Sequence, residues 1–311
     1  MRIVYAGAPE FSVAPLKSLT DAGFCAVAVV TQPDKPVGRK AILTPTPLKS
    51  YALSQGIPVY DFAKIREHVS ELRSFGADVM VTCAYGQLLT QEVLSAFPKG
   101  VYNIHASLLP RWRGASPIQH AILAGDEKTG VTVMKTDIGL DTGDMLLCEE
   151  APILPCDTAA TLSEKLSLLG GGCIVRALKE LEAGTAAFTK QDGARATLCK
   201  KIKKEECVVD FSRPAKEVCD LIRAMNPSPL AYAFVNGKLV NFYFAEPCEC
   251  AESAETGRVV RADKTGVYVA AGGGCVKITE LQLEGGKRMR AADAVNGRKI
   301  AVGDAFAKER A

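Results

Sequence analysis

The chain has 311 residues, of which 48% are hydrophobic and 23% are charged, with a net charge of +3. This balance excludes a mainly disordered chain, and the length favours two domains over one. The charge neither requires nor excludes a nucleic-acid partner. No apolar run approaches the roughly 20 residues that cross a bilayer, and the N-terminus resembles neither a signal peptide nor a transit peptide. We therefore expect a cytoplasmic protein that does not bind membranes.

In the first two hundred residues, short apolar runs alternate with helical patterns. The apolar runs have the length and composition of strands and cover residues 3–7, 24–31, 57–62, 77–86, 100–106, 130–137 and 145–154. Helical periodicity is present over residues 15–23, 48–56, 69–76, 116–126 and 161–184, the last as one long helix or a helix pair. This alternation predicts a Rossmann-like α/β fold, with a mostly parallel sheet and helices on both faces.

A proline-rich excursion at residues 32–47 interrupts this pattern. It is too long and too often broken by proline to be a simple turn. Regular structure resumes with the helical segment at residue 48. The excursion is therefore more than a connecting turn.

The pattern changes again near residue 204. One amphipathic helix and a proline turn precede the run 231–244, which carries Asn236-Gly237, a strong signal for a two-residue hairpin turn. More short strands follow at 257–263, 266–272 and 275–283, with little helix between them. This predicts a small OB-like β-barrel. We expect two domains, residues 1–203 and residues 204–311.

Several common chemistries are excluded by missing motifs. The first strand ends in a single glycine, Gly7, and the chain has neither a dinucleotide-binding G-x-G-x-x-G after it nor a P-loop. No G-x-S-x-G surrounds a serine, and Cys83 lies inside an apolar run, so we interpret its thiol as inert core. The cysteines within apolar runs, including Cys25 and Cys148, are predicted to be buried free thiols. C-x-x-C and H-E-x-x-H motifs are absent, and we expect no metal.

One histidine stands apart from the other two. His68 and His120 lie in helical patterns and are expected on the surface or in packing. His105 follows Asn103 by two residues in a predicted strand, so both side chains project to the same side at its carboxyl end. Asp141 lies between two glycines in IGLDTGD, where alone it would be read as a turn residue. The three supply an amide, an imidazole and a carboxylate, and these residues alone leave catalytic and structural roles of His105 open.

Two segments carry a resemblance to a known family. NIHASLLPRWRG, residues 103–114, and TDIGLDTGDM, residues 136–145, resemble signatures of the folate-dependent formyltransferases, and the likeness runs along essentially the whole chain. It implies transfer of the formyl group of 10-formyltetrahydrofolate to the α-amino group of methionine on initiator methionyl-tRNA. Asn103, His105 and Asp141 would be the catalytic residues. Asn103 would hold the oxyanion, while His105 and Asp141 would relay protons, and which of the two is the base stays open.

The resemblance also implies where the two substrates bind. Folate would lie against loops that follow three strands, at Tyr85, Gln87, Leu88, Ser107, Leu108, Leu109, Pro110, Ile138, Gly139 and Leu140. The tRNA would bind to the proline-rich excursion and to the start of the second domain, through Arg39, Lys40, Lys200, Lys201, Lys203 and Lys204. In this chain Ala41 and Ile42 make the excursion less basic and more apolar than is usual in the family. We expect a monomer.

Two alternatives are kept. One is a folate-dependent formyltransferase acting on a small amine, such as an amino sugar nucleotide or an aminoribotide. The other is a non-catalytic RNA-binding module. The excursion and the predicted barrel argue against a small acceptor. The presence of Asn103, His105 and Asp141 argues against a module without activity.

Overall fold

The structure is a computed structural model that describes residues 1–38, 40–249 and 254–310. The chain forms two compact units. The first comprises Met1–Pro117, Lys128–Pro152 and Ser163–Cys199, and the second comprises Ile118–Glu127, Ile153–Leu162 and Lys200–Ala311. The two short segments of the second unit were not anticipated from the sequence. The predicted domain boundary after residue 203 stays a prediction.

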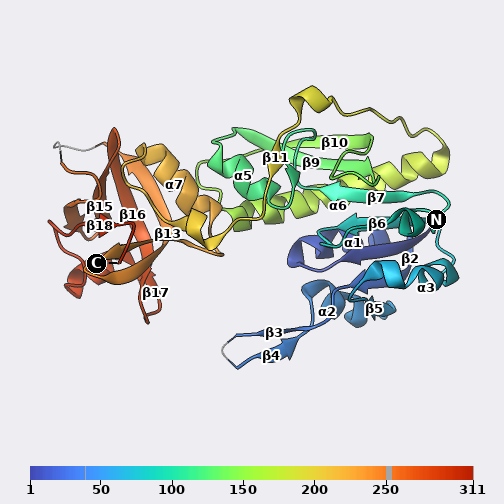
Figure 1. Ribbon diagram of the computed structural model, residues 1–311, viewed down its shortest axis with the longest axis horizontal. Coiled ribbons are helices and arrows are strands. Elements are labelled where there is room, and N and C mark those ends of the chain that lie inside the picture. Colours follow the sequence, from blue (N-terminus) through green and yellow to red (C-terminus); the bar gives the residue numbers. More distant parts are fainter. Residues whose placement is uncertain (39, 250–253, 311) are drawn as a thin grey trace. The chain divides into compact units, whose positions relative to one another are not determined.

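A seven-stranded sheet forms the centre of the first unit, in the order β10-β9-β7-β6-β1-β2-β5 (Figure 1). Its strands are β1 (Arg2–Gly7), β2 (Cys25–Thr31), β5 (Val59–Asp61), β6 (Val79–Cys83), β7 (Val101–His105), β9 (Lys128–Lys135) and β10 (Met145–Pro152). The five strands from β7 to β5 are parallel, whereas β9 and β10 are antiparallel to their neighbours. The predicted mostly parallel sheet is therefore confirmed.

Helices cover both faces of this sheet. They are α1 (Val13–Asp21), α2 (Pro47–Ser54), α3 (Val69–Ser74), α4 (Gln91–Leu94) and α6 (Ala159–Ala183). Helix α5 (Pro117–Leu123) lies almost entirely in the second unit. On one face, Leu72 of α3 and Val93 of α4 join a buried cluster with Val4 and Met80 of the strands. On the other face, α6 packs so closely that a Cβ at Gly170 would stand 2.9 Å from Ile104. The segment 161–184, predicted as one long helix or a helix pair, is one continuous helix.

The proline-rich excursion contains regular structure that its sequence did not indicate. Strands β3 (Lys35–Val37) and β4 (Ile42–Thr44) pair antiparallel to each other, with Pro36 opposite Leu43. Proline is tolerated here because a two-stranded ribbon consists only of edge strands, which do not need every N–H. The apolar side chains of this hairpin are exposed: 56% for Val37, 62% for Ile42 and 68% for Leu43.

The second unit is built on a curled antiparallel sheet, in line with the OB-like β-barrel predicted for this part of the chain. Its elements are α7 (Ala215–Ala224), β12 (Ala231–Val235), β13 (Lys238–Cys248), β14 (Val259–Asp263), β15 (Gly266–Ala271), β16 (Gly274–Leu283), β17 (Arg288–Arg290), α8 (Ala291–Asn296) and β18 (Phe306–Ala307). Asn236 and Gly237 both have positive φ, as the predicted hairpin turn requires. A bridge between Arg258 and Ala305 joins the regions that precede β14 and β18, the outer strands.

The cysteine prediction holds only in part. Cys25, Cys83 and Cys148 are free thiols, but only Cys83 is buried, because the ends of β2 and the edge strand β10 leave the other two exposed. Cys275 is disulfide-bonded, so the prediction of free thiols is wrong there. In the described part of the chain, no helix has both the length and the apolar character that a membrane span needs.

Candidate active site

Strand β7 brings Asn103 and His105 to the carboxyl edge of the sheet, next to the end of β6. Asn103 lies opposite Thr82 in the parallel β6–β7 pair, and the Thr82 hydroxyl donates to Asn103 Oδ1 at 2.9 Å. This bond fixes the orientation of the amide and leaves the Nδ2–H group as the donor that a substrate can use. Ile104, between the two site residues, points to the opposite face and packs on α6. The alternation predicted from the sequence is thus the one observed.

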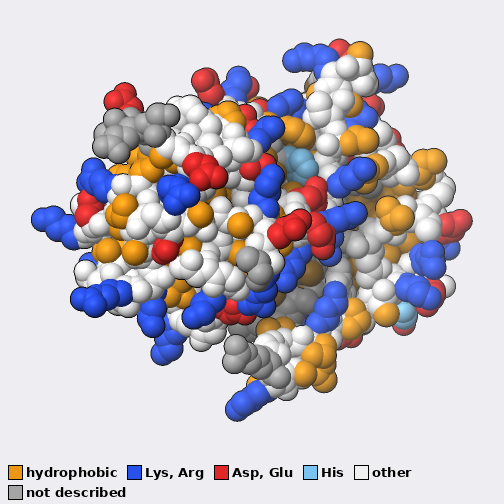
Figure 2. Space-filling model, turned by 60° about the vertical axis from the view of Figure 1, so that its left-hand side comes forward, with side chains coloured by type: hydrophobic (Ala, Val, Ile, Leu, Met, Phe, Trp, Pro, Cys, Tyr) orange, Lys and Arg blue, Asp and Glu red, His pale blue; other side chains and the backbone are white. Residues whose placement is uncertain are grey.

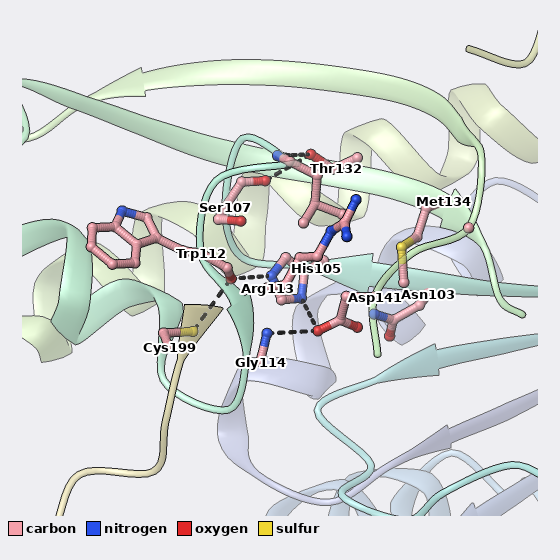
Figure 3. A network of polar contacts seen from close by, with 12 residues as sticks. Asn103, His105, Ser107, Trp112, Arg113, Gly114, Thr132, Met134, Asp141 and Cys199 are labelled. Carbon is pink, nitrogen blue, oxygen red and sulfur yellow. Dashed lines mark hydrogen bonds and ion pairs between the residues drawn. The ribbon is translucent and has the colours of Figure 1, made fainter. Parts of the chain in front are cut away.

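His105 is buried, with 5% of its surface exposed, and lies between two oxygen atoms. Its Nε2 is 2.9 Å from the backbone carbonyl oxygen of Trp112. A carbonyl can only accept, so Nε2 carries the proton. The other ring nitrogen, Nδ1, lies 3.7 Å from Asp141 Oδ2 (Figure 3). Nδ1 is therefore the atom of this imidazole that can gain or lose a proton.

The Trp112 carbonyl is aimed at His105 by an unusual backbone. Trp112 has a φ of +63°, a region that bulky residues rarely adopt and that costs on the order of 1–3 kcal/mol. Neighbouring bonds hold it there: Trp112 N–H donates to Thr197 Oγ1 at 2.9 Å, and the Cys199 thiol donates to the Trp112 oxygen at 3.3 Å. The surrounding structure thus specifies the proton position on His105.

Asp141 reaches the site from the loop between β9 and β10. Its backbone is left-handed, with a φ of +52°, and the Gly114 N–H donates to Asp141 Oδ2 at 2.8 Å. Gly114 belongs to β8 (Arg113–Gly114), which pairs in parallel with β11 (Leu198–Cys199). A Cβ at Gly114 would stand 2.1 Å from the Cys199 carbonyl oxygen, so only glycine fits where this N–H is presented.

The segment after α6 supplies site residues that sequence reasoning missed. Gln191 bonds to the Asp141 loop and to Arg113, and Thr197 and Cys199 bond to Trp112. These residues are separated from their partners by between 48 and 87 positions. No motif, periodicity or charge pattern in the sequence marks them.

The residues expected to contact folate differ in how their side chains are placed. Ser107 and Leu109 are buried, and Ser107 Oγ donates to the Arg111 carbonyl at 2.6 Å. Gln87 uses both ends of its amide within the protein, to Phe62 and Ile65. Among the other residues expected to contact folate, Tyr85 is buried, and Leu108 and Pro110 are half-buried. The exposed ones are Leu88, Ile138, Gly139 and Leu140.

Three of these exposed residues are apolar and large. Leu88 is 86% exposed, Ile138 is 79% exposed and Leu140 is 57% exposed. They lie on loops that follow β6 and β9. The Tyr85 hydroxyl is buried and has no hydrogen-bond partner among the residues that the structure describes, and burial raises its pKa. The folate-binding role of all ten residues stays a prediction.

The predicted tRNA-binding lysines are exposed. Lys40 lies in the turn of the β3–β4 hairpin, and Lys200, Lys201, Lys203 and Lys204 lie at the start of the last segment of the second unit. Arg39 lies outside the described residues. Lys and Arg side chains are scattered among acidic and apolar ones on the face drawn in Figure 2.

The remaining candidate groups fit structural roles. Burial raises the pKa of the Cys83 thiol to about 12, so this thiol stays protonated, in line with an inert core residue. His68 stacks on Phe62 with the ring centroids 4.0 Å apart. Within residues 1–38, 40–249 and 254–310, no three His, Cys, Asp or Glu side chains are grouped to hold a metal ion.

The site places an amide donor, an imidazole and a carboxylate at the carboxyl edge of a Rossmann-like sheet. These groups are suited to acyl transfer, and comparison with known proteins indicates formyl transfer. Residues 1–178 match the family model of formyl transferases, and residues 201–299 match that of the formyl transferase C-terminal domain. The chain belongs to the formyl transferase family, which confirms the resemblance seen in its sequence.

Similar curated proteins carry a more specific name. The methionyl-tRNA formyltransferase of Herminiimonas arsenicoxydans is 46% identical over 308 residues, which cover 96% of this chain and 97% of that protein. The methionyl-tRNA formyltransferase of Chromobacterium violaceum is also 46% identical, over 97% of this chain and 98% of its own.

Solved structures at 19% identity share the fold. HypX from Aquifex aeolicus in complex with tetrahydrofolic acid matches with a TM-score of 0.69 over 97% of this chain, which spans 48% of HypX. The N-formyltransferase from Helicobacter canadensis, in complex with folinic acid and dTDP-3-aminofucose, matches with a TM-score of 0.69 over 92% of this chain and 99% of its own.

Proposed function

We propose that this protein transfers the formyl group of 10-formyltetrahydrofolate to the α-amino group of methionine on initiator methionyl-tRNA, for translation initiation in the cytoplasm. The observation that carries the proposal is 46% identity, over nearly the full length of both chains, to proteins named methionyl-tRNA formyltransferase. The juxtaposition of His105 and Asp141 beside Asn103 supports it, because these groups meet the needs of formyl transfer.

The reaction requires three things of the site. The amine must be neutral to attack the formyl carbon, and the tetrahedral oxyanion must be stabilised. As the bond from the formyl carbon to folate N10 breaks, N10 must receive a proton. One proton leaves the amine and one reaches N10, so a single group that first accepts and then donates can serve both steps.

Asn103 is proposed to stabilise the oxyanion. Thr82 occupies its Oδ1 at 2.9 Å, which orients the Nδ2–H group as the donor. A preoriented donor of this kind typically lowers the barrier by about 2.7–4 kcal/mol. The position of Asn103 on a rigid strand keeps the reorganisation cost of this interaction low.

His105 is proposed to be the proton carrier, acting through Nδ1. The Trp112 carbonyl keeps the proton on Nε2, so Nδ1 of the neutral ring can accept the proton of the attacking amine and later pass it to N10. Asp141 would stabilise the imidazolium that forms between these steps, from 3.7 Å. Its Oδ2 already accepts a bond from Gly114, which fits a charge partner better than a base.

The binding assignments are part of the same proposal. Folate would contact the loops that carry Leu88, Leu108–Pro110 and Ile138–Leu140, where exposed apolar side chains suit a pterin ring. The tRNA would contact the β3–β4 hairpin and the lysines from Lys200 to Lys204. The exposure of these lysines supports a role in binding phosphate.

The test is a formyl-transfer assay with three acceptors: initiator methionyl-tRNA, elongator methionyl-tRNA and a dTDP-amino sugar. We expect efficient formylation of the initiator tRNA alone. His105→Ala should lower the rate by about 10²–10⁴-fold while the protein stays folded, because it removes the proton carrier. Preference for the amino sugar would establish the small-amine alternative instead, and a near-normal rate in the His105 variant would reject the proposed site.

A further inference from the structure

Gln191 connects two parts of the site that are distant in the sequence. Its Nε2 donates to the Asp141 carbonyl oxygen at 2.9 Å and to the Gly143 carbonyl oxygen at 2.8 Å. Its Oε1 accepts a bond from Arg113 Nε at 3.0 Å. Arg113 directly precedes Gly114, whose N–H binds the Asp141 carboxylate. The Gln191 amide therefore binds both the loop that carries Asp141 and strand β8, whose Gly114 N–H donates to the Asp141 carboxylate.

The backbone beside Gln191 is fixed in place. Thr189 and Met145 exchange both backbone hydrogen bonds, each 2.8 Å long, as an isolated antiparallel bridge. This pair anchors the segment to the first residue of β10. The side chain of Gln191 is half-buried. The backbone two residues before Gln191 is therefore anchored to the sheet.

Side-chain packing contributes little to the position of the tip of the loop that carries Asp141. Ile138 and Leu140 are 79% and 57% exposed, so they contribute little packing. Asp137 Oδ1 accepts bonds from the Gly139 N–H at 3.0 Å and the Thr142 hydroxyl at 2.7 Å, which shape the loop internally. Neither bond fixes the loop relative to His105. The bonds that tie Asp141 to the rest of the site come from Gly114 and Gln191.

We propose that Gln191 is a positioning residue for formyl transfer, which sets the place of the Asp141 carboxylate beside His105 Nδ1. This inference rests on the proposed function. Without the Gln191 amide, two carbonyl oxygens lose their donor and the left-handed turn at Asp141 loses its support. The carboxylate then moves away from the imidazole, and the imidazolium formed during transfer loses its charge partner. Gln191 acts through Asp141 and does not contact the reacting atoms.

The first test separates turnover from binding. Gln191→Ala should lower kcat by between about 10-fold and 100-fold, the range that a displacement near 1 Å produces, with KM for both substrates within twofold. Gln191→Glu should be slower still, because its carboxylate faces two carbonyl oxygens. Asp192→Ala is the matched control: it removes one local bond in the same segment, from Ala194 N–H at 3.0 Å, and should keep kcat within twofold. Unchanged kcat in Gln191→Ala, or an equal loss in Asp192→Ala, would overturn the inference.

The second test is a double-mutant cycle with Asp141→Asn, measured by single-turnover rates. If Gln191 acts through Asp141, Gln191→Ala should cost less than about twofold once the Asp141 charge is gone. Full additivity of the two losses would reject the inference, because a general structural defect affects both backgrounds equally. Failure of the proposed function has a different signature: the unaltered protein would then not formylate initiator methionyl-tRNA.

Discussion

Asn103 is the site residue whose two ends have separate tasks. Its oxygen is bound by Thr82, and its nitrogen is the proposed oxyanion donor. We expect Asn103→Ala to lower kcat by about 10²–10³-fold. Asn103→Asp should be slower than the alanine variant, because it keeps the oxygen but places a negative charge where the oxyanion forms. Both rates can be measured under saturating folate and initiator methionyl-tRNA.

A control for this prediction lies one strand away. Thr82→Val removes the hydroxyl that orients the amide but leaves the Asn103 donor in place. Its effect on kcat should be smaller than that of Asn103→Ala. An Asn103→Asp variant faster than Asn103→Ala would contradict the oxyanion role.

At the scale of single residues, the structure brings together candidate residues that share a local pattern in the sequence. Asn103 and His105 stand two apart in a strand, and Asp141 lies in a glycine-flanked turn, so their spacing carried information. Gln191 and Thr197 are 50 and 85 positions from the groups that they bind. The Trp112 contribution is a carbonyl, which every residue type has. Such partners are defined by the fold and leave no mark in local sequence.

Among the elements, α6 offers the sharpest contrast between neighbouring positions. Gly172→Ala should raise the free energy of unfolding by about 0.5–1 kcal/mol, because Gly172 is exposed in mid-helix and a Cβ there meets nothing within 4 Å. Gly170→Ala should lower it, because its Cβ would stand 2.9 Å from Ile104 and overpacking costs about 1–3 kcal/mol. Denaturant unfolding of both variants checks the opposite signs.

The same pair also tests the link between packing and chemistry. Ile104 lies between Asn103 and His105 on β7, so a shift forced by Gly170→Ala reaches both site residues. We expect kcat to fall in this variant and to stay unchanged in Gly172→Ala. A stable, fully active Gly170→Ala protein would show that α6 does not constrain the strand.

Helices and strands were predicted correctly where the sequence shows a long apolar periodicity or a specific turn signal. The β12–β13 hairpin followed from Asn236-Gly237, and α6 followed from a long apolar periodicity despite its three central glycines. Prediction failed for the β3–β4 hairpin, because proline suggested a loop, and for α4 and α8, which have only 4 and 6 residues. Elements this short are stabilised mainly by tertiary packing. Helix α3, also of 6 residues, was nevertheless predicted from its helical pattern.

On the scale of the whole molecule, the proposed tRNA-binding lysines predict a specific salt dependence. Each lysine that binds a phosphate releases counterions, so affinity falls steeply as salt rises. Replacing Lys203 and Lys204 by alanine should raise KM for initiator methionyl-tRNA. The slope of log KM against log salt should become shallower by about 0.7–0.9 for each phosphate that the variant no longer binds. KM for the formyl donor should not change.

Lys17→Ala provides the control for this prediction, because Lys17 is an exposed lysine on α1 that pairs with Asp21 at 2.6 Å. It changes the net charge by one without touching the proposed tRNA surface, so the salt slope for tRNA should stay that of the unaltered protein. A change of slope in Lys17→Ala that is half as large as in the Lys203/Lys204 variant would mean that the effect follows net charge alone, because Lys17→Ala removes one charge and the other variant removes two. A rise in KM for the formyl donor would instead assign these lysines to the folate site.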